Sequence, residues 1–213
     1  MNYKRIPLGP IWTNSYVIDD GNGIAVCCDV GGDPADVLAY LRNEKLSLTA
    51  IVLTHGHMDH ILGAADLIDA TGAEIYVPEQ DLSLLTDPDR NLAGEFGYEV
   101  RPVTPDHRVH DGDVFTVGGM TFTALHTPGH TCGSTCYLVR QGDEKMLLSG
   151  DTLFARSIGR TDLVEGDPVA MTRSLERLKA LKGDMPVLPG HGPETTLEKE
   201  RRWNPFLTGE RSL

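Results

Sequence analysis

Six consecutive residues constrain this chain more than any other segment: His55-Gly56-His57-Met58-Asp59-His60. They place three imidazoles and one carboxylate in a short loop. The loop follows Ala50-Ile51-Val52-Leu53-Thr54, an apolar stretch that predicts a buried strand. The end of a strand is a rigid platform for ligating side chains. Because imidazole nitrogen and carboxylate oxygen both bind zinc and similar divalent ions, the loop predicts a metal site.

Three later residues occupy the same kind of position. His130, Asp151 and His191 each follow a glycine, directly beyond an apolar stretch. Each alone is explained equally well as a turn or capping residue. Together they form a pattern, because five of the eight histidines lie in loops of this kind at strand ends. We therefore expect all of these side chains to converge on one cleft.

The bulk composition narrows the class of protein. With 213 residues and 40% hydrophobic content, the chain can form one large domain over residues 1–213. Its net charge of −12 argues against binding to nucleic acid. The sequence contains no apolar run long enough to span a membrane, and its first residues lack the apolar core of a secretory signal. We therefore expect a cytoplasmic protein that binds neither nucleic acid nor membrane.

The four cysteines allow a second kind of metal site. Cys132 and Cys136 have a C-x₃-C spacing close to His126 and His130, which is compatible with structural zinc. The alternative is that Cys136 is an ordinary small buried residue at the start of a strand. We favour the second interpretation, because short cysteine spacings often arise by chance. His107, His110 and His126 lack the strand-end context and are left out of the site.

The hydrophobic pattern predicts a mixture of strands and helices. An Asn-Gly turn predicts a hairpin near residue 22, and Asp33 is a candidate cap for the helix that follows. The segment 78–98 is polar and predicts a helix and a loop near the site. The predicted strands cover 14–19, 24–29, 50–53, 73–77, 99–103, 114–117, 120–126, 135–139, 146–148 and 186–188, and the predicted helices cover 34–42, 61–72, 169–181 and 194–203. This order fits sheets that carry helices on their outer faces.

The ligand run resembles the H-x-H-x-D-H signature of the metallo-β-lactamase fold superfamily. Thr127-Pro128-Gly129-His130-Thr131, Ser149-Gly150-Asp151-Thr152 and Pro189-Gly190-His191-Gly192-Pro193 match later elements of that family in the same order. The resemblance covers nearly the whole chain. It implies an α/β fold, the αββα sandwich, with the metal site at one edge of the sheets.

The resemblance also implies a role for each candidate ligand. His55, His57 and His130 would hold one metal ion, Asp59, His60 and His191 would hold a second, and Asp151 would bridge the two. Zinc is the first expectation for both ions, and iron or manganese also fit these ligands. Such a pair activates a bridging hydroxide as the nucleophile of a hydrolase. Asp59 would in addition be catalytic, by orienting this hydroxide or accepting its proton.

Within the superfamily, the chain is most similar to the small bacterial glyoxalase II-like hydrolases. It shares their Gly-Arg-Thr-Asp-Leu element at 159–163 and their Asn-Pro-Phe-Leu element at 204–207. This implies cleavage of a thioester such as S-lactoylglutathione, a small anionic substrate. With two metal ions and three negative groups, the site would carry a charge of about +1, which attracts an anion. Arg160 and Arg156 are candidates for binding the substrate carboxylate.

Several alternatives stay open. An iron-dependent persulfide dioxygenase also resembles the chain around Gly159 to Asp162. A non-catalytic metal-bound scaffold is a third hypothesis. Zinc β-lactamases most often have a cysteine where Asp151 stands, so we do not expect antibiotic hydrolysis. Full-length glyoxalase II has a C-terminal glutathione-binding extension and a lysine and tyrosine that Arg160 and Asp162 replace, so lactones and other acyl thioesters are alternative substrates.

The two interpretations of the cysteines predict different outcomes for one variant. If Cys136 is simply buried and Cys132 is not a ligand, Cys132→Ser should leave the metal content of the purified protein unchanged. Metal analysis of wild type and variant, purified side by side, measures this. Loss of metal from the variant would restore the cysteine-site hypothesis.

Overall fold

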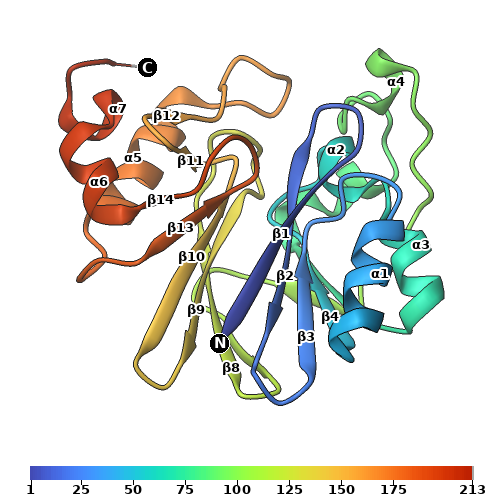
Figure 1. The fold of residues 1–213 in the computed structure, drawn as a ribbon. Coiled ribbons are helices and arrows are strands. Elements are labelled where there is room, and N and C mark those ends of the chain that lie inside the picture. Colours follow the sequence, from blue (N-terminus) through green and yellow to red (C-terminus); the bar gives the residue numbers. More distant parts are fainter. Residues whose placement is uncertain (213) are drawn as a thin grey trace.

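Two mixed sheets lie face to face at the centre of the molecule, with helices on both outer faces (Figure 1). The computed structural model describes residues 1–212. The first sheet has the order β1 (Asn2–Leu8), β2 (Thr13–Asp19), β3 (Ile24–Cys28), β4 (Ser47–Val52), β5 (Glu74–Pro78), β6 (His107–Val109). The second has the order β14 (Thr195–Thr196), β13 (Pro186–Pro189), β10 (Glu144–Gly150), β9 (Thr135–Gln141), β8 (Met120–His126), β7 (Val114–Val117). A small pair, β11 (Leu153–Phe154) and β12 (Ser157–Ile158), follows β10.

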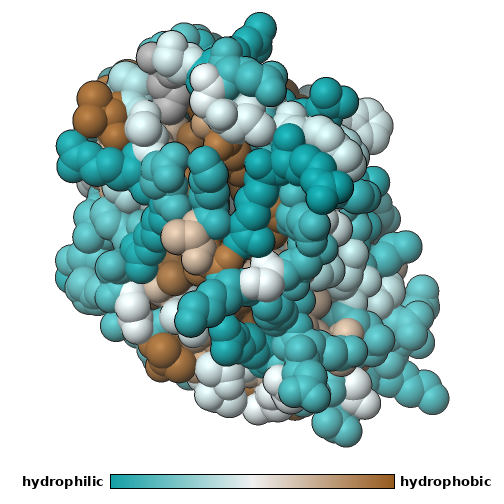
Figure 2. Space-filling view, turned by 90° about the vertical axis from the view of Figure 1, so that its left-hand side faces the viewer, coloured by the Kyte–Doolittle hydropathy of each residue, from teal (hydrophilic) through white to brown (hydrophobic). Residues whose placement is uncertain are grey.

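Helices close both outer faces. On the first sheet lie α1 (Ala35–Glu44) and α3 (Ala64–Thr71), and on the second lie α5 (Pro168–Lys179), α6 (Leu197–Trp203) and α7 (Pro205–Thr208). The side chain of Asp167 caps α5 by accepting from two backbone amides, and the helix buries Met171, Leu175 and Leu178. The face that carries α5 to α7 is largely hydrophilic, with apolar residues in small separate groups (Figure 2).

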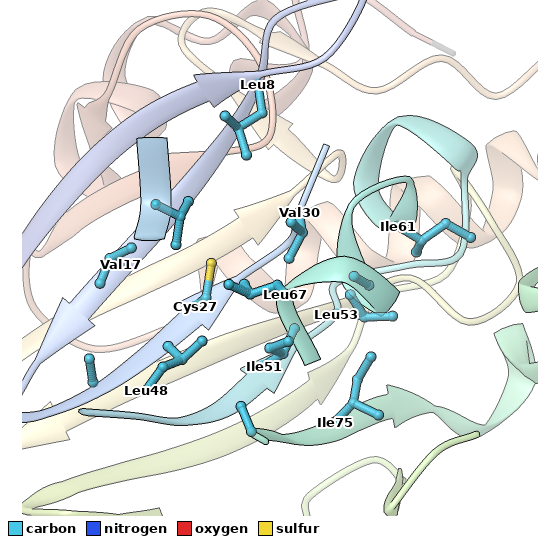
Figure 3. Packing of buried hydrophobic residues seen from close by; sticks show 14 of the residues in the cluster. Leu8, Val17, Cys27, Val30, Leu48, Ile51, Leu53, Ile61, Leu67 and Ile75 are labelled. Atoms are coloured by element: carbon cyan, nitrogen blue, oxygen red, sulfur yellow. The ribbon is translucent and has the colours of Figure 1, made fainter. Parts of the chain in front are cut away.

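Alternation along the strands builds three hydrophobic layers. In β2, Tyr16 and Ile18 point between the two sheets, whereas Val17 points toward α1 and α3. In β10, Leu148 faces the first sheet and Leu147 faces α5. Figure 3 shows how side chains from β2, β3, β4 and β5 pack against those of α2 (Met58–Ile61) and α3. The molecule is therefore the αββα sandwich that the sequence predicts.

Strand direction brings the loops of interest to one edge. β3, β4 and β5 are mutually parallel, so their carboxyl ends share an edge of the first sheet. In the second sheet β8 and β10 are both antiparallel to β9, and β13 is parallel to β10, so these three strands also point the same way. The two edges are joined directly, because Thr135 N donates to Thr54 O at 2.8 Å and Asn14 N donates to Gly190 O at 2.7 Å.

The structure corrects parts of the predicted element list. The predicted strand at 99–103 is wrong: Pro102 and Pro105 lack a backbone donor, and Val100 and Val103 instead pack against the core from a loop. The predicted helix over 61–72 is two helices, α2 and α3, separated at Leu62-Gly63. The strands β1 and β6 were not predicted. No helix among residues 1–212 combines the length and apolar character needed to cross a bilayer.

Candidate metal centre

The seven predicted ligands lie together at this shared edge. Their donor atoms form three overlapping groups, each with atoms within 4.8 Å of one another. One group is His55, His57 and His130, and another is Asp59, His60 and His191. Asp151 joins His55 and His60 in the third group. The structure thus brings together two triads of side chains with one aspartate placed against both.

The position of Asp151 is set by the distances around it. Its Oδ1 lies 3.4 Å from His60 Nε2, and its Oδ2 lies 3.5 Å from both His130 Nε2 and His191 Nε2. It therefore approaches one triad through His130 and the other through His60 and His191. A carboxylate with its two oxygens so placed is suited to bridging two ions.

The cluster is largely shielded from solvent, and four of its donor atoms have no hydrogen-bond partner in the protein. The side chains are buried, apart from His191, whose side chain is 26% exposed. The Nε2 atoms of His55, His57 and His60 and Oδ1 of Asp151 are buried without any hydrogen-bond partner. Orphaned buried polar atoms are costly and rare in folded proteins. Their convergence here fits a site that holds metal ions, since metal ions would satisfy these atoms together.

The protonation preferences of His55 and His57 agree with this interpretation. Burial lowers the pKa of His57 to about 3 and the pKa of His55 well below its usual range, with neighbouring imidazoles acting in the same direction. Neutral imidazole is the form that binds metals. At His60 burial also lowers the pKa, but the carboxylates of Asp59, Asp151 and Asp29 outweigh it and raise the pKa well above its usual range.

Asp29 orients the ligand loop from outside the cluster. It follows β3 directly, and its Oδ2 lies 2.8 Å from His60 Nδ1 and accepts from Thr54 Oγ1 at 2.8 Å. Thr54 Oγ1 in turn lies 3.0 Å from His55 Nδ1. Such contacts fix the imidazole planes so that Nε2 points into the site. Asp29 was not among the predicted site residues, although an acid at the end of the predicted strand 24–29 was a signal that pointed to it.

Asp81 joins the two loops that carry His57 and His130. It is fully buried on the 3₁₀ helix η1 (Glu79–Leu85). Its Oδ2 accepts from Gly56 N at 2.9 Å and from Thr131 Oγ1 at 2.7 Å, and its Oδ1 accepts from Gly133 N at 2.6 Å. One carboxylate therefore holds a residue beside His57 and two residues just after His130. No sequence pattern pointed to this role.

Three further contacts position ligands near the cavity. Thr13 Oγ1 donates to Asp59 Oδ2 at 2.7 Å, and His191 Nε2 lies 3.1 Å from the same oxygen. Burial raises the pKa of Asp59, but His60, His191 and Thr13 together lower it well below its usual range. On the opposite side His130 Nδ1 lies 2.8 Å from the backbone oxygen of Arg160.

A cavity of about 430 Å³ opens onto the cluster. Arg160 lines it, together with the loop residues around α4 (Ala93–Phe96) and β11 and β12. The Arg160 guanidinium is exposed and makes two bonds to Asp162, of 2.6 and 2.8 Å. Arg156, the other predicted substrate-binding residue, is not among the lining residues, and its backbone N–H donates to Glu200 Oε2 at 2.7 Å.

The residues left out of the predicted site lie elsewhere. His107 lies 2.8 Å from Glu74 Oε2, His110 lies 3.5 Å from Asp113 Oδ2, and His126 Nε2 lies 2.8 Å from Cys132 O. Within residues 1–212 no cysteine belongs to a group able to hold a metal ion. Cys136 is fully buried in β9, as the sequence analysis favoured.

Comparison with known proteins identifies the family. The model of the metallo-beta-lactamase superfamily matches residues 8–191, and the chain belongs to this superfamily. It is 35% identical to the "Probable metallo-hydrolase YqgX" of Bacillus subtilis, over 98% of this chain and 99% of that protein. It is 32% identical to the hydroxyacylglutathione hydrolase GloC of Haemophilus influenzae, over 99% of this chain and 100% of that protein. The fold and the His/Asp cluster are those of a metallo-hydrolase.

Solved structures share the whole fold. The BLEG-1 B3 metallo-beta-lactamase superimposes with a TM-score of 0.91 at 39% identity, covering 98% of this chain and all of that one. TTHA1623 in a di-iron-bound form superimposes with a TM-score of 0.84 at 37% identity, covering 96% of this chain and 100% of that one. ETHE1 from Myxococcus xanthus superimposes with a TM-score of 0.78 at 29% identity, covering 98% of this chain and 85% of that one. A di-metal site is thus consistent with both the cluster geometry and a relative of known structure.

Removing a predicted ligand should remove metal and activity together. We expect His57→Ala and Asp151→Ala to weaken metal binding by more than about 100-fold, beyond the effect of groups that only orient ligands. Metal content and chelator competition measure this. His110→Ala is the matched control, since this exposed histidine lies outside the cluster. Full metal content in the Asp151 variant would contradict its bridging position.

Asp81 should act on metal affinity without touching metal. In Asp81→Asn one acceptor oxygen becomes a donor that faces donors, so we expect a loss of about 1–3 kcal/mol in the free energy of unfolding. We also expect metal affinity to fall about 10- to 100-fold, because the loops of His57 and His130 lose their common anchor. Chelator competition and denaturant unfolding measure the two effects, and the exposed Asp143→Asn serves as control. Unchanged metal affinity would show that Asp81 is only structural.

Proposed function

We propose that this chain is a metal-dependent thioester hydrolase, with S-lactoylglutathione as the first substrate to test. The observation that carries the proposal is the pair of buried triads with Asp151 between them, open to a cavity on one side. The similarity to a hydroxyacylglutathione hydrolase along the whole chain supports the choice of substrate. Zinc is our first expectation for the metal, and the di-iron form of TTHA1623 supports testing iron as well.

The lining of the cavity favours attack by water. Among the described residues that line it there is no serine, threonine, cysteine or lysine to serve as a protein nucleophile. Divalent ions bound to this cluster would supply Lewis acidity to a carbonyl group and would activate water. A thioester needs little help with its leaving group, because a thiol is a far weaker base than an amine. Hydrolysis without a covalent enzyme intermediate is the reaction class that fits.

Asp59 is our proposed proton acceptor. Its carboxylate lines the cavity and is held in place by Thr13 and His191. Its lowered pKa keeps it ionised at neutral pH. A carboxylate fixed in this way can orient the attacking water and take up its proton as the new bond forms. The contact between His130 Nδ1 and the Arg160 backbone oxygen fixes the orientation of the His130 ring.

Thiol release from S-lactoylglutathione by the purified, metal-loaded protein tests the proposal. We expect rapid release that is lost after treatment with a chelator and restored by adding back a divalent metal. A coloured thiol reagent follows the product continuously. A protein with full metal content that releases no thiol from any acyl thioester would overturn the proposal.

A second candidate is hydrolysis of a β-lactam ring, which requires the same attack on a carbonyl group. The similarity to BLEG-1 favours testing it, although Asp151 led us not to expect this activity. A chromogenic cephalosporin assayed beside the thioester under the same metal loading compares the two. Oxygen consumption with glutathione persulfide, measured on iron-loaded protein, examines the dioxygenase alternative.

Asp59 separates an enzyme from a metal-bound scaffold. We expect Asp59→Asn to lower turnover about 10²- to 10⁴-fold, the range typical of a lost general base. Metal content is measured in parallel, because Asp59 is also a predicted ligand. A variant that keeps its metal and its full turnover would contradict the proposed role.

A further inference from the structure

The cavity has an apolar part, here called the apolar wall, that the metal chemistry does not require. Apart from the ligand loops, it is formed by six residues: Ile11, Leu92, Phe96, Phe154, Ile158 and Leu163. They come from both halves of the sandwich. The loop between β1 and β2 and the segment around α4 contribute from the first half, and the β11–β12 segment and the loop after it contribute from the second (Figure 1).

Apolar side chains at the mouth of this cavity are left in water. Ile11 is 46% exposed and Phe96 is 52% exposed. Among the described residues eight large hydrophobics are exposed, and Trp12, Tyr98 and Val164 lie within two positions of a wall residue. Five of the eight are therefore wall residues or lie within two positions of one in the sequence. Exposed apolar side chains that line a cavity are typical of a binding site.

The wall is held in a strained backbone. Leu92 has a φ of +71° and Trp12 a φ of +62°, values that residues other than glycine seldom adopt. Asn91 fixes the conformation at Leu92: its side chain donates to Leu84 O at 2.7 Å and accepts from Ala93 N at 2.9 Å. Its backbone oxygen accepts from Met58 N at 2.8 Å, which ties the segment to the ligand loop. Strain that the surroundings hold in this way is typical of a functional site.

The residues around the wall offer little uncompensated positive charge to bind a polyanion. Outside the metal cluster the charged lining residues, within the described chain, are Glu95 and Arg160. Two guanidinium nitrogens of Arg160 already bind Asp162, and Glu95 raises the pKa of the same arginine further, after Asp162 itself. The positive charge beside the wall is therefore largely compensated by the protein.

We propose that the apolar wall binds the acyl group of the substrate, and that the preferred substrates are thioesters with an unbranched apolar acyl chain. This inference rests on the proposed thioester hydrolysis. A thioester has two arms, and the thiol arms of glutathione and pantetheine both carry amides. Burying an amide against a wall without donors or acceptors is costly, whereas a hydrocarbon chain gains from it. The acyl arm is the one that matches the wall.

A chain-length series on one constant thiol tests this. S-acetyl-, S-butanoyl- and S-hexanoylglutathione are compared with S-lactoylglutathione on the metal-loaded protein. We expect kcat/KM to rise about three- to four-fold per added methylene, because each methylene leaves water. Binding of S-hexylglutathione, which cannot be hydrolysed, should be correspondingly tighter than that of S-methylglutathione by calorimetry.

Leu92→Gly is the variant that tests the role of the wall in acyl binding most directly. Glycine adopts a positive φ freely, so the backbone should keep its course while the side chain leaves the wall. We expect the ratio of hexanoyl to acetyl kcat/KM to fall about tenfold, and the advantage of S-hexylglutathione in binding to shrink with it. Phe96→Ala is a second variant of the wall. Val169→Ala is the control, since this valine is 58% exposed on α5 away from the cavity.

Each outcome separates the two claims. Thioester cleavage at rates independent of chain length would overturn the apolar wall and leave the proposed function standing. No thioester cleavage, with S-hexylglutathione still bound more tightly than S-methylglutathione, would overturn the function and support the wall as an apolar site. Equal chain-length dependence in wild type, Leu92→Gly and Phe96→Ala would place the acyl group elsewhere.

Discussion

The gathering of seven imidazole and carboxylate side chains, six of them buried, at one edge of the sandwich is the constraint on which the rest of the structure depends. Polar groups in a dry interior are costly unless each has a partner, and here several face only one another. The direction of the strands makes the arrangement possible, because parallel strands deliver their carboxyl ends to the same place. Metal ions are the partners that would satisfy the remaining donor atoms together.

The supporting contacts fix the shape of the ligand loops. Asp29 fixes the ring of His60. Asp81 joins the loop that carries His57 to the loop that carries His130, through Gly56 and Thr131. Both aspartates are buried and accept hydrogen bonds from backbone and hydroxyl groups. Their hydrogen bonds hold the ligand loops in place, so that the nitrogen and oxygen atoms that face the centre of the cluster can bind metal.

The sequence predicts the clustered side chains much better than the residues that hold them. His55 to His60 share one segment, and His130, Asp151 and His191 each follow an apolar strand, so strand-end position was enough to predict that they lie together. Asp81 lies far from every ligand in sequence and meets the site only through the fold. In the segment 99–103, which was predicted to be a strand, Val100 and Val103 pack against the core from a loop. β1, with its mixed polar and apolar residues on the edge of a sheet, gave no clear period.

In our proposal the ligand cluster carries out the reaction, and the apolar wall selects the acyl group of the substrate. The chemistry of the cluster suits metal-dependent hydrolysis, whereas the wall comes largely from loops, which in general tolerate sequence change best and often carry specificity. Leu92 shows how the two are linked, because Asn91 beside it bonds to the loop that carries His57 and His60. Chemistry and substrate choice are therefore built on the same frame.

We propose that the cluster holds two metal ions. Anomalous scattering from crystals of the metal-loaded protein, recorded at the absorption edge of the bound metal, tests this proposal. We expect two peaks, one among His55, His57 and His130 and one among Asp59, His60 and His191, with Asp151 between them. A single peak, or metal bound away from these side chains in fully loaded crystals, would contradict it.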